Sequence, residues 1–199
     1  MADIEDVLAY WFGHLQGDVT AENKRSLWFK GSEEIDREIT ERFRDLVSQA
    51  GRGELNAWTE TPRGTLALLI LLDQFSRNIY RGLAAAFRYD SLAQALCKRG
   101  LAKNFDRSLT PIEQAFFYMP LEHSEALEDQ EESVFRFDQL RQSVPAEHKA
   151  VFDDFYQYAV SHYQVIKDFG RFPHRNAACG RLSTRDEISY LQTAHRFGQ

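Results

Sequence analysis

The stretch Leu66–Leu72 most constrains the fold, because seven consecutive residues are apolar. It follows Thr61-Pro62, a helix start with a capping hydroxyl and proline at the first helical position. A helix that is apolar on every side lies inside a domain, covered by other elements. A buried strand is the alternative interpretation, but we find no second convincing strand to pair with it. The run is too short to span a bilayer.

Helical patterns account for most of the remaining chain. Apolar residues recur at helical spacing in several segments, which predicts helices over about 4–12, 35–50, 90–99, 111–119, 121–140, 145–169 and 185–191. Capping residues or capping boxes begin several of them, at Asp3, Ser32, Thr110 and Thr184. Glycines are expected to end four of them, at Gly13, Gly51, Gly100 and Gly170. Pro120 is expected to break the helix that begins at Pro111.

These elements predict an all-α protein without strands. Eight or nine short-to-medium helices with tight connections favour stacked antiparallel hairpins. No linker or low-complexity run interrupts the pattern, so we expect a single helical domain over residues 1–199.

Composition excludes several function classes. The formal net charge of -6 argues against a general nucleic-acid binder, which needs a basic face. The two cysteines, Cys97 and Cys179, form neither a zinc pattern nor a disulfide framework. The acidic N-terminus lacks the features of a signal peptide. We therefore expect a soluble cytoplasmic protein without a membrane or nucleic-acid partner.

Three segments concentrate polar side chains beside apolar ones. They are 73–81, which directly follows the apolar run, 122–130, and 167–181, which is interrupted by glycine and proline. We expect them to meet at one ligand-binding site. Its candidate residues are Asp73, Gln74, Arg77, Asn78, Arg81, Glu122, His123, Glu125, Arg171, His174, Arg175, Asn176 and Arg181.

Three functional hypotheses follow from these segments. The first is a cleft that binds a small anionic ligand, either as a binding protein or as an enzyme, because arginine is suited to carboxylates and phosphates. The second is an interaction module that clamps a peptide or its C-terminal carboxylate with Asn and Arg. The third is a structural cluster in which arginines pair with acidic residues to hold helices together.

Catalytic candidates are limited to generic acid–base groups. His123, His174 and Glu122 have suitable side chains, but the spacing assigns them no reaction. Ser124 and Cys179 are weaker candidates for a nucleophile. Metal-ligand residue types are present, at Glu122, His123, Glu125, His162, Asp168 and His174. Because none has a spacing typical of a metal site, we expect neither zinc nor another cofactor.

Several motifs together resemble a known family. They are 71–81 (LLDQFSRNIYR), 118–125 (YMPLEHSE), 169–176 (FGRFPHRN) and the opening 7–13 (VLAYWFG). In this order they resemble the bacterial "domain of unknown function 924" family over nearly the whole chain. The resemblance implies a helical fold similar to tetratricopeptide-repeat proteins, a right-handed superhelix of antiparallel helix pairs. It implies no established activity, and the roles of the matching motif residues are unassigned.

Overall fold

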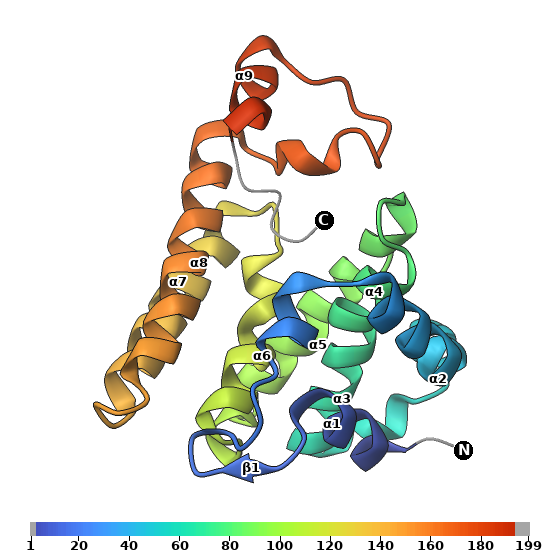
Figure 1. The fold of residues 1–199 in the computed structure, drawn as a ribbon, viewed down its shortest axis with the longest axis vertical. Helices are drawn as coiled ribbons and strands as arrows, with labels where there is room; N and C mark the ends of the chain where they lie inside the picture. Colours follow the sequence, from blue (N-terminus) through green and yellow to red (C-terminus); the bar gives the residue numbers. More distant parts are fainter. Residues whose placement is uncertain (1–2, 194–199) are drawn as a thin grey trace.

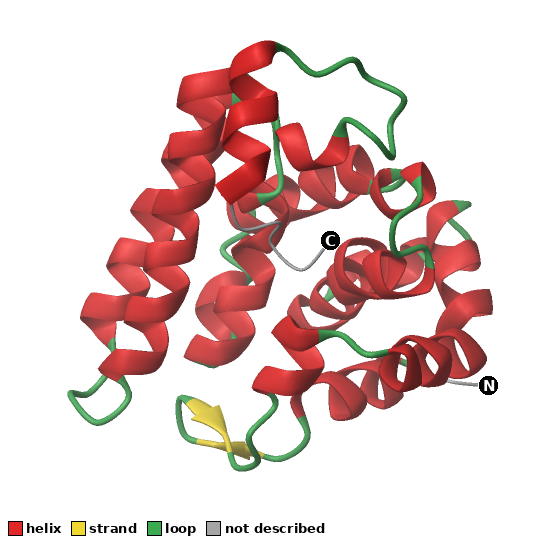
Figure 2. Cartoon of the chain, turned by 45° about the horizontal axis from the view of Figure 1, so that its top comes forward, coloured by secondary structure: helices red, strands yellow, loops and turns green. Residues whose placement is uncertain are grey.

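The computed structural model describes residues 3–193, and within them the chain is helical apart from one small hairpin (Figures 1 and 2). The α-helices are α1 (Ile4–Phe12), α2 (Glu33–Gly51), α3 (Pro62–Leu69), α4 (Ser76–Ile79), α5 (Asp90–Ala102), α6 (Pro111–Glu122), α7 (Leu127–Ser143), α8 (Lys149–Phe169) and α9 (Arg185–Thr193). The 3-10 helices are η2 (Asn56–Glu60), η4 (Ala84–Phe87), η5 (Asp106–Ser108) and η6 (Pro173–Arg175), and the π-helical turns are η1 (Ser26–Lys30) and η3 (Ile70–Phe75).

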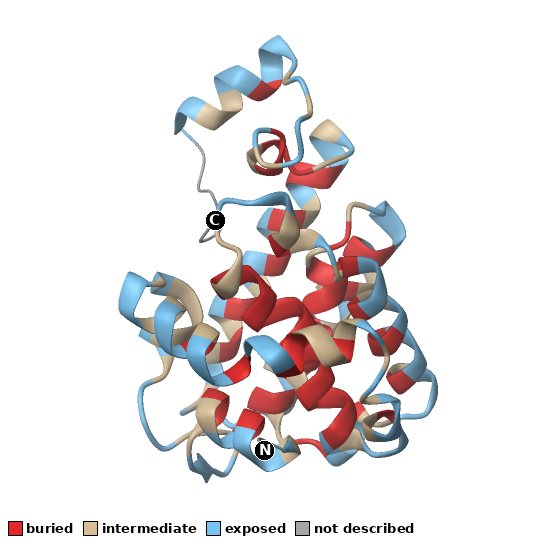
Figure 3. Cartoon of the chain, turned by 90° about the vertical axis from the view of Figure 1, so that its right-hand side faces the viewer, coloured by how far each residue is buried: buried red, intermediate tan, exposed pale blue. Residues whose placement is uncertain are grey.

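The apolar run lies at the centre, as the sequence predicts. Thr61 caps α3 by accepting from the backbone N–H of Gly64, and every residue from 64 to 78 is buried. The helix runs through η3 directly into α4, so 62–79 form one nearly continuous helical rod. Figure 3 shows buried residues concentrated in the middle of the helical body. The strand interpretation is therefore wrong.

One apolar cluster extends through α1 to α8, in which Trp11 makes edge-on contacts with both Phe75 and Phe116. Helices α7 and α8 lie side by side along one side of the molecule, and α6 packs against α7 (Figure 1). A smaller cluster, around Phe172, lies beneath α9. No helix between residues 3 and 193 is both long and apolar enough to cross a membrane.

Several details differ from the sequence-based expectations, among them the start of α8 at Lys149 rather than at Pro145. A two-stranded hairpin, β1 (Leu15–Gln16) with β2 (Val19–Thr20), turns at Gly17, whose φ of 63° suits glycine. Gly100 lies inside α5, where its missing side chain makes room for Phe117. Pro120 lies inside α6 near its C-terminus, where the helix continues for two more residues. Because the connection 123–126 is not helical, α7 begins at Leu127 rather than Leu121.

Candidate functional site

A pocket of about 920 Å³ lies between α8, the C-terminal half of the central rod and the 171–176 loop. One part of its wall is apolar and aromatic, with Trp28, Phe29, Phe155, Tyr158 and Val165. The other part is polar, with Gln74, Arg77, Asn78, Arg81, Glu122, His123, His162, His174 and Arg175. A pocket of this size, apolar with a few convergent polar groups, is typical of small-molecule sites.

Asp90, the first residue of α5, joins two arginines of the pocket wall. Arg77 donates from Nη1 to Oδ1 at 2.9 Å and from Nη2 to Oδ2 at 3.2 Å. Arg175 donates from Nη1 to Oδ2, also at 3.2 Å. All three side chains are buried. The central rod and the 171–176 loop, which are far apart in the sequence, therefore meet at this carboxylate.

Asp73 forms a second buried pair, with His123. Nδ1 of His123 lies 2.8 Å from Oδ1 of Asp73, and Arg77 lies 3.3 Å from the same oxygen. Asp73 is placed here by the π-helical turn η3, a distortion that is frequent at functional sites. Although burial opposes it, His123 and Arg77 hold the pKa of Asp73 below its usual value. Burial lowers the pKa of His123 despite the neighbouring Asp73.

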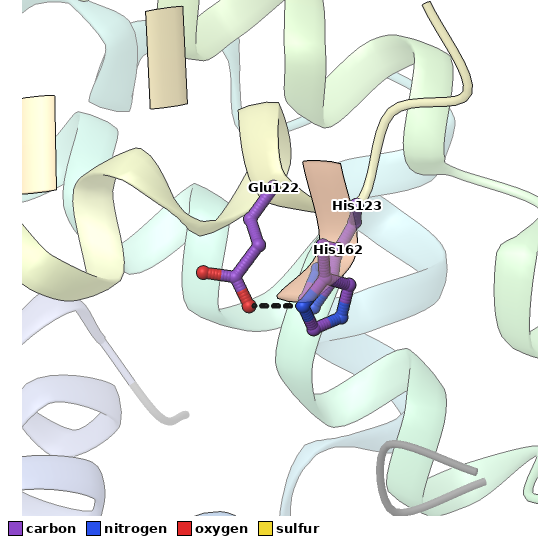
Figure 4. A group of neighbouring side chains, drawn as sticks. All are labelled: Glu122, His123 and His162. Carbon is purple, nitrogen blue, oxygen red and sulfur yellow. Dashed lines mark ion pairs between the residues drawn. The ribbon is translucent and has the colours of Figure 1, made fainter. Parts of the chain in front are cut away.

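Glu122, the last residue of α6, faces the two histidines of the site (Figure 4). Its Oε1 lies 3.1 Å from Nδ1 of His162, on α8. That nitrogen also lies 2.8 Å from the carbonyl oxygen of Tyr158. The other carboxyl oxygen, Oε2, is buried and has no hydrogen-bond partner among the described residues. Burial, together with the nearby Asp73, raises the pKa of Glu122 to about 8.

Arg175 is held by rings as well as by hydrogen bonds. Its guanidinium carbon lies 4.6 Å from the ring centre of Phe87 and 4.4 Å from that of Phe172. Nη2 donates to the carbonyl oxygen of His123 at 3.0 Å, whereas Nε has no acceptor among residues 3–193. Burial and the neighbouring Arg77 lower its pKa to about 10, so the side chain is cationic at neutral pH.

His174 lies beside Arg175 and Arg77, and its pKa reflects their positive charge. Burial lowers its pKa first, and the charges of Arg175 and Arg77 lower it further, to about 3. The imidazole is therefore neutral at physiological pH. This depression means that an additional positive charge is disfavoured at this part of the pocket wall.

A separate network holds the loop that carries Arg175. Glu125 accepts two bonds from Arg181, at 2.9 and 3.0 Å, and one from the backbone N–H of Phe172 at 2.8 Å. Glu187 accepts from Arg171 at 2.6 and 2.8 Å, from the backbone N–H of Thr184 and from Asn176. The Thr184–Glu187 capping box is confirmed by this geometry.

A family model of bacterial proteins of unknown function, DUF924, matches residues 7–195. The chain belongs to the DUF924 family. A solved structure of similar fold is the protein of unknown function Atu0120 from Agrobacterium tumefaciens, with a TM-score of 0.80 and 30% sequence identity. The match covers 96% of this chain and 97% of that one. A comparison with curated proteins gives no match.

The residues named from the sequence fall into two groups in this DUF924 protein. Eight of them line the pocket: Gln74, Arg77, Asn78, Arg81, Glu122, His123, His174 and Arg175. Asp73 supports this group through its bonds to His123 and Arg77. The other four, Glu125, Arg171, Asn176 and Arg181, are not part of the pocket wall. They stabilise the loop because their polar groups pair with one another or with Glu187.

Two pocket residues are also engaged in structural bonds. Asp36 of α2 accepts from Asn78 at 2.8 Å and from Arg81 at 2.7 and 2.9 Å.

The two weaker nucleophile candidates lie outside the pocket. Ser124 is buried and donates to Asp129 at 2.7 Å, and Cys179 is exposed. Neither belongs to the pocket wall.

Sequence reasoning missed the carboxylates that organise the site in this family member. Asp90 and Asp36 each lie in the first turn of a helix, where acidic residues are common for reasons of helix stability alone. His162 is named from the sequence only as a residue type that can bind metal, because it stands on the buried face of a long amphipathic helix, where a structural role is common. Only the tertiary fold brings Asp90 and Asp36 to the polar segments, so no local pattern could have identified these two carboxylates.

Proposed function

We propose that the pocket binds a small organic anion with an apolar body. The acidic group lies against Arg175 and Arg77, and the apolar body lies along the wall formed by Trp28, Phe155 and Tyr158. The proposal is carried mainly by one observation, that Arg77 and Arg175 share the carboxylate of Asp90 while Nε of Arg175 has no acceptor among the described residues. Guanidinium groups with donors to spare are well suited to a carboxylate or phosphate.

The electrostatics and the shape support the same ligand class. The depressed pKa of His174 reflects a positive field that an anion would relieve. The aromatic part of the wall provides contact area for an apolar body without adding charge. We further propose that the pocket could convert the bound molecule, with His123, His174 and Glu122, which all line the pocket, as the candidate acid–base groups.

A peptide-binding role is less well supported. In that hypothesis the helices stack as a tetratricopeptide-like superhelix, and asparagine and arginine clamp a peptide carboxylate. The amide of Asn78 already donates to Asp36, and the amide of Asn176 already donates to Ser183, so neither is available for a peptide carboxylate.

The purely structural hypothesis describes the Glu125 and Glu187 networks well, but it leaves buried hydrogen-bond donors and acceptors of the pocket without partners among the described residues.

A thermal-shift comparison of matched probes tests the proposal. The probes are octanoate and phenyl phosphate, with octanol and phenol as uncharged counterparts, added to metal-free protein in the presence of a chelator. We expect both anions to raise the melting temperature and the uncharged molecules to have little effect. Arg175→Gln should abolish the shift, whereas Arg52→Gln, which removes an exposed arginine paired with Glu54, should retain it. Equal shifts from the anions and their counterparts would contradict the proposal.

A further inference from the structure

Three residues of the pocket wall place metal-ligand atoms close together. Glu122, His123 and His162 each offer one such atom, and the three atoms all lie within 4.8 Å of one another. Figure 4 shows the Glu122 carboxylate pointing toward the imidazoles. We propose that these side chains form a binding site for one divalent transition-metal ion, with Zn²⁺ as the expected occupant. This site is independent of the organic anion proposed above, and it reverses the sequence-based expectation of no metal.

The donor set and its spacing fit such an ion. Two imidazoles and one carboxylate are the ligands of many catalytic zinc sites, in which a fourth position stays open. An ion at about 2.1 Å from tetrahedral ligands requires about 3.4 Å between donors. The observed 3.1 Å between Oε1 of Glu122 and Nδ1 of His162 is close to this value. All three residues line the pocket, so the open position faces it.

The surroundings also resemble a metal site. Ligating histidines usually donate their other ring N–H to a carboxylate, which orients the ring. Asp73 occupies this position behind His123, 2.8 Å from Nδ1, and leaves Nε2 as the ligand atom of that ring. Glu122 provides a second and independent observation, because its Oε2 is buried without a partner although the side chain is only 4% exposed. An ion would supply the missing partner.

Ion binding changes one hydrogen bond and the position of one ring proton of His162. In the metal-free site Nδ1 of His162 donates to the carbonyl oxygen of Tyr158 at 2.8 Å. Coordination through Nδ1 replaces that hydrogen bond, and the ring proton moves by exchange with solvent to Nε2, so that the imidazole stays neutral. The positive charge of the two buried arginines is partly offset before the ion binds, because Arg77 is paired with Asp73 and Asp90 and Arg175 with Asp90.

Titration with Co²⁺ tests the site directly, because Co²⁺ bound by nitrogen and oxygen ligands absorbs visible light. The chelator-treated protein is titrated without any organic anion, and Zn²⁺ is then added as a competitor. We expect one equivalent of Co²⁺ to bind with an absorption band that one equivalent of Zn²⁺ removes. Failure of octanoate to bind in the chelator experiment would leave this result unchanged, so the two proposals are tested separately.

Variants identify the ligands. Glu122→Gln and His162→Gln should each weaken Co²⁺ binding by at least tenfold, and Asp73→Asn by roughly 10–100-fold through its effect on His123. His14→Ala is the matched control, since His14 forms a histidine–carboxylate pair with Glu22 but has a side chain that is 91% exposed. Melting temperatures confirm that each variant is folded. Absence of the band in the wild-type protein, or a band lost in His14→Ala and retained in Glu122→Gln and His162→Gln, would overturn the proposal.

Discussion

Nη1 of Arg175 lies 3.2 Å from Oδ2 of Asp90, although the two residues are 85 positions apart in the chain. This contact joins the 171–176 loop to the start of α5, beside the central rod. It is the link through which separate polar segments become one pocket wall. The predictions below test this link, the network that supports the loop, and the packing of the core.

Arg77→Ala should destabilise the protein more than Arg175→Ala. Arg77 pairs with both Asp73 and Asp90, so its removal leaves buried carboxylates short of a partner, at an expected cost of about 3–5 kcal/mol. After removal of Arg175, Asp90 keeps its bonds to Arg77, and we expect a loss of about 1–3 kcal/mol. Urea denaturation at neutral pH measures both. Equal losses, or the reverse order, would show that the two arginines are not arranged as described.

Glu125→Ala should loosen the loop without unfolding the helices. The carboxylate of Glu125 accepts from the backbone N–H of Phe172 and from Arg181. We expect amide hydrogen exchange at Phe172 to accelerate at least about tenfold, because the amide loses its acceptor. Exchange in the middle of α8 should change little. Glu128→Ala, which alters an exposed residue of α7, is the control and should leave Phe172 protected.

The Glu187 network should add a pH-dependent part to stability. Hydrogen bonds from Arg171, and also from Thr184 and Asn176, lower the pKa of Glu187 to about 2. Because the folded-state pKa is below the unfolded value, this contribution is fully present above about pH 4.5 and is lost as the pH falls toward 2. The stability difference between wild type and Glu187→Gln should therefore be smaller at pH 3 than at pH 7. A difference that is constant across this range would be inconsistent with the ionised carboxylate.

Gly100→Ala should destabilise the core, although alanine is the better helix former. A Cβ at this position would lie 2.5 Å from Cζ of Phe117, within a buried contact between α5 and α6. Overpacking of this kind typically costs about 1–3 kcal/mol, which exceeds the roughly 0.5–1 kcal/mol gained from helix propensity. A lowered melting temperature is the expected result. A raised one would mean that the helices separate easily at this point.

The helices were largely predictable from the sequence because their signals are local. Asp3, Ser32 and the Thr110–Glu113 box cap helices as expected, and the apolar run 66–72 is buried as expected. The errors occurred where packing overrides local preference. Gly100 does not end its helix, because the glycine accommodates Phe117, and residues 123–126 leave the helix that their composition favours.

The site was predictable only in part for the same reason. Polar residues next to a buried run, such as Asp73 and Arg77, are conspicuous in the sequence; Arg77 lines the pocket and Asp73 supports it from behind. In the sequence, Arg171 and Arg181 cannot be told apart from the pocket arginines. In the structure they bind Glu187 and Glu125, which support the loop. Which arginine faces a pocket and which one stabilises a loop depends on where Glu125 and Glu187 lie after folding. Only the tertiary structure shows where these two carboxylates lie.

The most direct measurement of the central claim is a crystal structure of the protein grown with octanoate. The account predicts density in the pocket, with the carboxylate within hydrogen-bond distance of the Arg175 guanidinium and the chain along Trp28 and Phe155. Density only at another surface, or a pocket without the fatty acid at concentrations that saturate the thermal shift, would contradict it.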